Sequence, residues 1–188
     1  MLYSAYSEEY FTATEFMSFT KDLDGRYELI DGRIFMMSSP SVTHQRLVRF
    51  TYDMFAPYFR EKNCEVFISP LDVFLYEKTI NDCTNVYQPD VFVVCNKDVV
   101  KERGIEGSPD LVVEIISKST AYNDYIHKLK NYMYYGVKEY WIVNYDSQQI
   151  TTFMKLDTFD TRTYNFSDII ESGLFDGLRI DFSLFDQS

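Results

Sequence analysis

Two acidic residues interrupt segments that otherwise read as buried β-strands. Glu114 lies inside the apolar run 109–117, and Asp90 opens the apolar part of the run 88–94. Apolar, β-branched runs of this kind are typical of central strands that are covered on both faces. An ionised carboxylate buried there without a partner would be strongly destabilising, because its charge would lose its hydration. Glu114 is therefore expected to be neutral, paired with a cation or bound to a metal ion, and Asp90 would join it if the two strands are neighbours.

The chemistry that suits this pair of acids is metal-assisted hydrolysis of a phosphodiester. A divalent cation that activates water takes hard oxygen ligands, usually one or two carboxylates together with water and substrate phosphate. Asp90 and Glu114 would supply the carboxylates, and a main-chain carbonyl near Ile115 could add another oxygen. Such sites often include a lysine that orients the attacking water. Lys128 is the candidate, and it lies one helical turn after Asp124, with which it could pair.

Three other polar residues are candidates for supporting roles in such a site. Glu28 lies in the middle of a predicted strand, where alternation of polar and apolar residues alone would place it towards solvent. His44 lies near a predicted helix start, where it would reach a phosphate group or remain exposed. Asp72 interrupts an apolar strand much as Glu114 does. Each of the three keeps a structural alternative.

The main candidates have structural alternatives as well. Glu114 could form a buried salt bridge with Lys128 without any metal ion. Asp90 could serve as a turn residue at the start of its strand, because Pro89 precedes it. Lys128 could be a solvated helix residue. Because both acids are expected at one place, a metal site is favoured over these alternatives for Glu114 and Asp90.

The elements that would position these residues form an α/β pattern. The start and turn signals are a capping box at 12–15, a hairpin turn at Asp31-Gly32, and helix N-caps at Ser41 or Thr43 and at Ser119 or Thr120. The expected strands are a hairpin over 26–37, then 64–68, 71–75, the two acid-bearing runs, 139–144 and 149–154, with short strands in the tail. The sequence therefore predicts a mixed central β-sheet flanked by α-helices.

The size and charge of the chain limit its organisation and its partners. The 188 residues contain no linker and no repeat, which predicts one domain over 1–188. The formal net charge is −11, from 29 acidic and 18 basic residues. Such a charge repels nucleic-acid phosphates unless basic residues cluster locally or metal ions intervene. It counts against tight, nonspecific binding of nucleic acid.

The cysteines and the N-terminus predict a compartment. Cys64, Cys83 and Cys95 are an odd number without CxxC spacing, and with only two histidines they give no zinc-site pattern. Reduced thiols in a cytoplasmic protein are therefore expected. The first ten residues lack the basic and apolar regions of a signal peptide, and no apolar run approaches the roughly 20 residues of a membrane span. We expect a cytoplasmic protein with no membrane partner.

A series of motifs occurs in order along the chain. They are Tyr27-Glu28-Leu29-Ile30-Asp31-Gly32, Ser39-Pro40-Ser41 with His44-Gln45, Gln88-Pro89-Asp90, the run 109–117, then Asp124, Lys128 and Tyr132, and finally the run 136–143. Together they resemble the Uma2 family, restriction-endonuclease-like proteins also called DUF820. The resemblance covers roughly residues 10–155 with compatible spacing and leaves 156–188 as C-terminal strands and a tail. No single motif is decisive, but the series is specific.

The resemblance implies the PD-(D/E)xK nuclease fold, in which a mixed sheet lies between helices and an Asp and a Glu hold Mg²⁺. By that resemblance, Asp90 and Glu114 would be the metal ligands and DNA the substrate. The chain departs from the wider nuclease pattern at Ile116, which replaces the lysine expected two residues after the glutamate. In this family the lysine is displaced to the following helix, which implies Lys128. Lys118 stands where the family usually has proline and is a second candidate.

Two functions of different classes remain. The first is a Mg²⁺- or Mn²⁺-dependent endonuclease that hydrolyses DNA phosphodiester bonds. The alternative is a catalytically inactive protein of the same fold that acts as a binding or regulatory module, which the net charge and the absent lysine at Ile116 favour. A nucleotide-binding protein is disfavoured, because no glycine-rich phosphate loop occurs among the seven glycines. A homodimer is plausible for cleavage of two strands, but no sequence feature requires it.

Overall fold

The structure is a computed structural model that describes residues 2–5, 9–116, 121–155 and 158–185, with 2–5 and 121–126 described by their backbone alone. One sheet has the order β1 (Leu2–Ala5), β3 (Arg33–Met37), β2 (Arg26–Ile30), β6 (Asn85–Tyr87), β5 (Val73–Leu75), β9 (Gly104–Glu106) and β8 (Val100–Lys101). The other has the order β13 (Phe159–Asn165), β12 (Gln149–Lys155), β11 (Glu139–Asn144), β10 (Leu111–Ile116), β7 (Val91–Val94) and β4 (Glu65–Ile68). Strands β14 (Ile169–Glu171) and β15 (Arg179–Asp181) form a separate pair.

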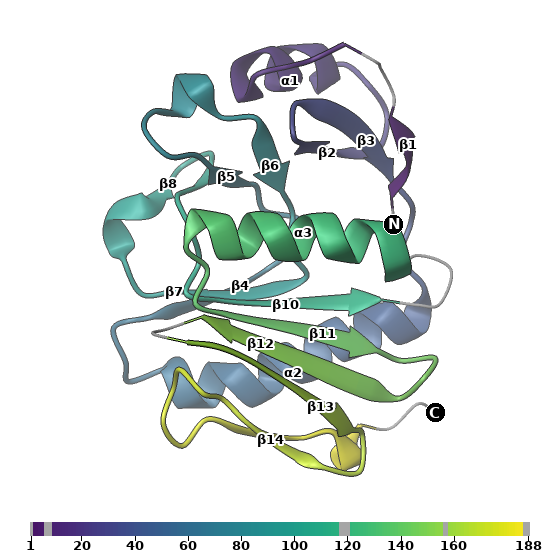
Figure 1. The fold of residues 1–188 in the computed structure, drawn as a ribbon, viewed down its shortest axis with the longest axis vertical. Coiled ribbons are helices and arrows are strands. Elements are labelled where there is room, and N and C mark those ends of the chain that lie inside the picture. Colours follow the sequence, from purple (N-terminus) through teal and green to yellow (C-terminus); the bar gives the residue numbers. More distant parts are fainter. Residues whose placement is uncertain (1, 6–8, 117–120, 156–157, 186–188) are drawn as a thin grey trace.

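The helices cover the six-stranded sheet on both faces. Helix α2 (Val42–Phe59) packs with residues such as Val113 and Trp141 on one face, whereas α3 (Ala121–Tyr135) packs with Val112 and Tyr140 on the other. Helix α3 lies between the two large sheets, and α1 (Ala13–Thr20) lies beside the β2–β3 hairpin (Figure 1). The predicted α/β class with mixed sheets is confirmed, with the strands divided between two large sheets.

Local signals in the sequence account for several element boundaries. The capping box that begins α1 is present, with Thr12 and Glu15 bonded to each other's backbone. Asp31 and Gly32 form the tight turn between β2 and β3, and both have positive φ, which suits Gly and is tolerated by Asp. Gly136 follows the last residue of α3 with φ of 101°, the expected left-handed C-cap. Ser41 is the N-cap of α2, which decides between the two predicted caps.

Two polar segments between the main predicted strands contain short structured elements. The polar region after residue 76 holds a 3₁₀ turn (Ile80–Asp82) and β6, and the charged region after 95 holds a second 3₁₀ turn (Lys97–Val99) with β8 and β9. Strands of two or three residues carry too few side chains for an alternating pattern, so their pairing partners define them. A third 3₁₀ turn (Phe182–Leu184) ends the described chain. Within the part of the chain described, no helix has the length and apolar character needed to cross a bilayer.

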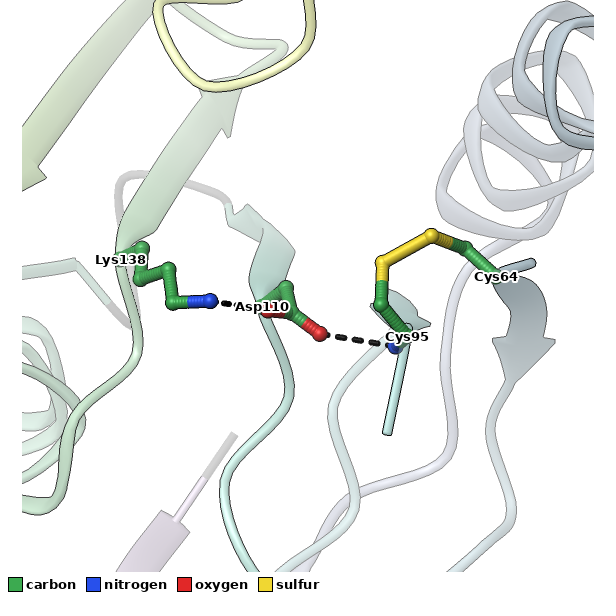
Figure 2. The surroundings of a disulfide bond; sticks show 4 residues. All are labelled: Cys64, Cys95, Asp110 and Lys138. Carbon is green, nitrogen blue, oxygen red and sulfur yellow. Dashed lines mark hydrogen bonds and ion pairs between the residues drawn. A yellow bond between two sulfur atoms is a disulfide. The ribbon is translucent and has the colours of Figure 1, made fainter. Parts of the chain in front are cut away.

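The expectation that all three thiols are reduced is wrong for two of them. Cys64 and Cys95 form a disulfide (Figure 2), and Cys83 is a buried free thiol. Strands β4 and β7 pair antiparallel with Glu65 opposite Val94, and continuing that register by one residue places the two cysteines opposite each other. A separation of 31 residues gave no sign of this pairing, which depends on the sheet register. The predicted cytoplasmic location remains a prediction.

The disulfide joins an edge strand to the strand that directly follows Asp90. The backbone N–H of Cys95 donates to Asp110 Oδ2 at 2.8 Å, and Asp110 Oδ1 accepts from Lys138 Nζ at 2.6 Å (Figure 2). At the other end of the same strand pair, the Ser69 N–H donates to the Asp90 carbonyl. The cross-link therefore closes a loop that includes the acid-bearing start of β7.

Replacing both cysteines, Cys64→Ala with Cys95→Ala, should lower the free energy of unfolding by about 2–4 kcal/mol, because the unfolded chain loses the constraint of a closed loop. Denaturant unfolding of the oxidised protein and of the double variant measures the difference. Thiol titration of the native protein should count one free cysteine after unfolding without reductant. A count of three would contradict the cross-link.

Candidate active site

The two predicted metal ligands lie opposite each other where two antiparallel strands meet, with Glu114 in β10 and Asp90 directly before β7. Strands β7 and β10 pair with Val91 opposite Val113, and one more step in this register brings Asp90 opposite Glu114. Directly opposed residues of an antiparallel pair project to the same face of a sheet. Glu114 also shares its face with Val112, on the side of the sheet that packs against α3. The prediction that the two acid-bearing strands are neighbours is therefore confirmed.

Glu114 is buried, and two donors converge on one of its oxygens. Its Oε1 accepts from Lys128 Nζ at 3.0 Å and from the Tyr132 hydroxyl at 2.8 Å. Lys128 and Tyr132 are four residues apart on α3, so they present their side chains on one helix face. Because of this spacing, the Lys128 ammonium and the Tyr132 hydroxyl both reach the Glu114 carboxylate.

Asp90 is held from two directions. Its Oδ2 accepts from the Ile115 N–H at 2.8 Å and contacts His44 Nε2 at 3.1 Å. An ionised carboxylate can only accept, so His44 Nε2 carries the proton. Burial raises the pKa of Asp90, but the hydrogen bond and charge of His44, the Ile115 N–H and the charge of Lys128 together hold this pKa below its ordinary value. Asp90 is therefore ready to act as an anionic ligand.

His44 reaches Asp90 because of how α2 begins. The Ser41 side chain accepts from the His44 N–H, which fixes the first turn of α2 with His44 on the side of β7. The Nδ1 atom of His44 is buried and has no hydrogen-bond partner in the described chain. The predicted role of His44 as a supporting residue thus has a specific neighbour, the carboxylate of Asp90.

Glu28 enters the same cluster from the other sheet. It is 0 % exposed, and its Oε1 accepts from Lys128 Nζ at 3.0 Å and from the Gln88 N–H at 2.9 Å. Its Oε2 is buried without a hydrogen-bond partner among the described residues. Gln88 directly precedes the Pro89-Asp90 pair, so Glu28 connects the lysine with the segment that carries Asp90.

The charges of this cluster perturb each other strongly. Burial raises the pKa of Glu114 above its ordinary value; Lys128 opposes this shift, and the negative charges of Asp90 and Glu28 add to it. Burial alone would lower the pKa of Lys128, but Glu114 and Glu28 raise it above its ordinary value. The Lys128 ammonium therefore stays charged, and the pKa of Glu114 is raised to about 7.

The remaining predicted residues lie at the edge of the cluster or outside the description. Asp72 Oδ1 accepts from Gln88 Nε2 at 2.8 Å, so Asp72 lies at the edge of the site and contacts the side chain of Gln88. Lys118 and the side chain of Asp124 lie outside the described residues. Among the described residues, Lys128 is the lysine in contact with Glu114, the pair that the structural alternative of a buried salt bridge also predicts. The assignment of Lys128 or Lys118 as the displaced motif lysine remains a prediction.

Sequence reasoning missed two members of the site. Tyr132 occurs in the motif series without a proposed role in the site; it is fully buried and donates its hydroxyl to Glu114. Its position four residues after Lys128 could have indicated a shared target. Gln88 was not a candidate, yet its backbone and side chain bind Glu28 and Asp72. A backbone contact of this kind leaves no signal in residue type.

The residues present fit a hard divalent cation. Hydrogen bonds within the described chain occupy Oδ2 of Asp90 and Oε1 of Glu114, which leaves the other oxygen of each carboxylate available to a ligand. No group of three or more His, Cys, Asp and Glu side chains in the described chain is arranged to hold a metal ion. Two carboxylates supplemented by water and substrate oxygens suit Mg²⁺, which retains several waters in proteins. Among the described residues, Asp90 and Glu114 are the pair that would hold it.

Known proteins resemble this chain in sequence and in fold. A protein of Synechocystis sp. (strain ATCC 27184 / PCC 6803 / Kazusa), described as uncharacterized, is 26% identical over 153 residues, covering 81% of this chain and 78% of that protein. A crystal structure from Anabaena variabilis ATCC 29413, titled as "a putative nuclease belonging to DUF820", superposes with a TM-score of 0.72 at 16% identity, covering 92% of this chain and 95% of that one. At such low identity, the second likeness establishes the fold.

The sequence model of one family matches nearly the whole chain. It covers residues 8–182, and the family is described as "Uma2: Putative restriction endonuclease". The match extends beyond the 10–155 expected from the motifs and includes β13, β14 and β15. The chain belongs to the Uma2 family.

Proposed function

We propose that this protein is a Mg²⁺-dependent endonuclease that hydrolyses DNA phosphodiester bonds. The observation that carries the proposal is the convergence of Asp90, Glu114 and Lys128, from β7, β10 and α3, in one buried cluster. Membership of a family described as restriction endonucleases supports the nucleic-acid substrate. Cleavage of both strands of a duplex would require two such sites, which a homodimer would supply.

Each residue has a role that follows from its contacts. Asp90 and Glu114 would hold Mg²⁺ through the oxygens that hydrogen bonds leave available. When bound, Mg²⁺ would act as a Lewis acid on the scissile phosphate and lower the pKa of an attacking water. Lys128 would place a fixed positive charge beside the negative charge that develops on the phosphate. His44 orients Asp90.

A non-catalytic binding or regulatory module remains the second candidate. The observation that favours it is the pairing of Lys128 with two carboxylates at 3.0 Å each, which already engages its ammonium within the protein. The net charge of −11 also opposes the approach of DNA. Metal binding and cleavage, measured separately, distinguish the two candidates.

Metal binding should depend on Glu114. Titration calorimetry with Mg²⁺ or Mn²⁺ should detect binding to the native protein, and Glu114→Gln should weaken it by more than about tenfold, because an amide cannot supply the ligand charge. Asp110→Asn is the matched control, because Asp110 directly precedes β10, the strand of Glu114, but its carboxylate pairs with Lys138. Equal affinities of the Glu114→Gln variant and the native protein would refute the assignment of Glu114.

Cleavage should depend on Lys128. With Mg²⁺ and duplex DNA, Lys128→Met should reduce turnover by about 10²- to 10³-fold, because an electrostatic stabiliser of the transition state is removed. Lys130→Met changes an exposed lysine of the same helix and serves as the control. A native protein that binds Mg²⁺ but cleaves neither duplex nor single-stranded DNA would support the non-catalytic module.

A further inference from the structure

Lys128 has two carboxylate partners that differ in what else they do. Its Nζ lies 3.0 Å from Oε1 of Glu114 and 3.0 Å from Oε1 of Glu28. Glu114 belongs to the six-stranded sheet and faces Asp90. Glu28 belongs to the sheet that contains the β2–β3 hairpin (the hairpin sheet), and the residue opposite it in that hairpin is not acidic. The same ammonium is thus shared between a proposed metal ligand and a carboxylate on a different sheet.

A divalent cation and Lys128 would compete for Glu114. Both are positive, and the ammonium already binds the carboxylate that the metal ion would need. If Glu114 were the sole anion beside Lys128, drawing it to a metal ion would leave a buried ammonium without a counter-ion, which is strongly unfavourable. A second anion beside Lys128 removes most of that cost.

Glu28 has the properties of such a second anion. It is completely buried, and the Gln88 N–H fixes its Oε1 beside Lys128. Its Oε2 is a buried acceptor without a partner in the described chain, so Glu28 has unused capacity for the ammonium. An unsatisfied buried oxygen is costly, which argues that it is retained for a reason other than stability.

A second tether keeps α3 against the hairpin that carries Glu28. Asn131, one turn after Lys128, donates to Asp31 Oδ1 at 2.9 Å and to the Tyr87 hydroxyl at 2.8 Å. Lys128 and Asn131 on the helix therefore match Glu28 and Asp31 on the hairpin, with the same spacing of three residues. Lys128 can stay with the hairpin sheet while Glu114 adjusts on the other sheet.

We propose that Glu28 is a positioning residue that retains the Lys128 ammonium when Glu114 turns to a divalent cation. This inference rests on the proposed metal site. Glu28 contacts neither the metal ion nor the substrate in this scheme. It acts through Lys128, and it should change metal affinity only as long as that lysine is present.

The test is a double-mutant cycle read by Mn²⁺ or Mg²⁺ calorimetry. Glu28→Gln should weaken metal binding by about tenfold, an ordinary coupling between contacting charged groups, because Lys128 then holds Glu114 alone. Lys128→Met should bind metal at least as tightly as the native protein. In the Lys128→Met background, Glu28→Gln should lose most of its effect. An equal loss in both backgrounds would overturn the proposal, because Glu28 would then act on the metal directly.

A second variant and a second readout keep the test decisive. Glu28→Asp retains the negative charge but shortens the side chain, so it should also weaken metal binding. If the Glu28→Gln variant does not fold, an unchanged metal affinity of the Glu28→Asp variant would overturn the proposal. NMR of ¹⁵N-labelled lysine ammonium groups should show a slowly exchanging Lys128 signal that Glu28→Gln removes. Asp110→Asn, which breaks a different lysine–carboxylate pair, should leave the Lys128 signal and the metal affinity unchanged.

These measurements separate the two proposals. Native metal binding with the predicted cycle but no DNA cleavage would uphold the role of Glu28 and reject the endonuclease. Metal binding and cleavage without any effect of Glu28→Gln would uphold the endonuclease and reject the role of Glu28. A native protein that binds neither Mn²⁺ nor Mg²⁺ would overturn both.

Discussion

The burial of several carboxylates around one ammonium is the constraint on which the rest of this structure depends. Glu28, Asp90 and Glu114 are all buried, and Lys128 is the lysine that contacts two of them. Charges removed from water are tolerated only when they are paired or hydrogen bonded. The strands and helices around the cluster are therefore arranged so that each carboxylate receives at least one donor, from a backbone N–H, a hydroxyl, an imidazole or the ammonium.

This requirement explains why the site lies where two sheets meet at α3. A single sheet could oppose Asp90 and Glu114, because antiparallel pairing fixes their register. It could not also present Glu28, which belongs to the hairpin sheet on the other side of the helix (Figure 1). Helix α3 provides the connection, because Lys128 contacts residues of both sheets from one helix turn. The cost of burying each charge thus links the packing of the layers to the geometry of the site.

The disulfide stabilises the strand that follows Asp90, one of the carboxylates of this cluster. It joins β4 to β7 at one end of their pairing, and the Ser69 N–H binds the Asp90 carbonyl at the other end. Strand β4 is at the edge of its sheet, and it pairs with β7 alone. Edge strands are the least constrained part of a sheet, so a covalent link there restrains β4 against β7, the strand that directly follows Asp90.

The sequence by itself determined the main helices and strands and the identity of the central acids. The local signals are apolar periodicity, the capping box, the Asp31-Gly32 turn and Gly136. Glu114 was identified because a carboxylate inside an apolar strand needs a partner for its charge. Tertiary structure alone decided the partners: the division into two sheets, the contact of His44 with Asp90, the hydroxyl of Tyr132 on Glu114, and the pairing of Cys64 with Cys95. These contacts join residues far apart in the chain through strand register and helix packing, and neither is encoded in any short window of residues.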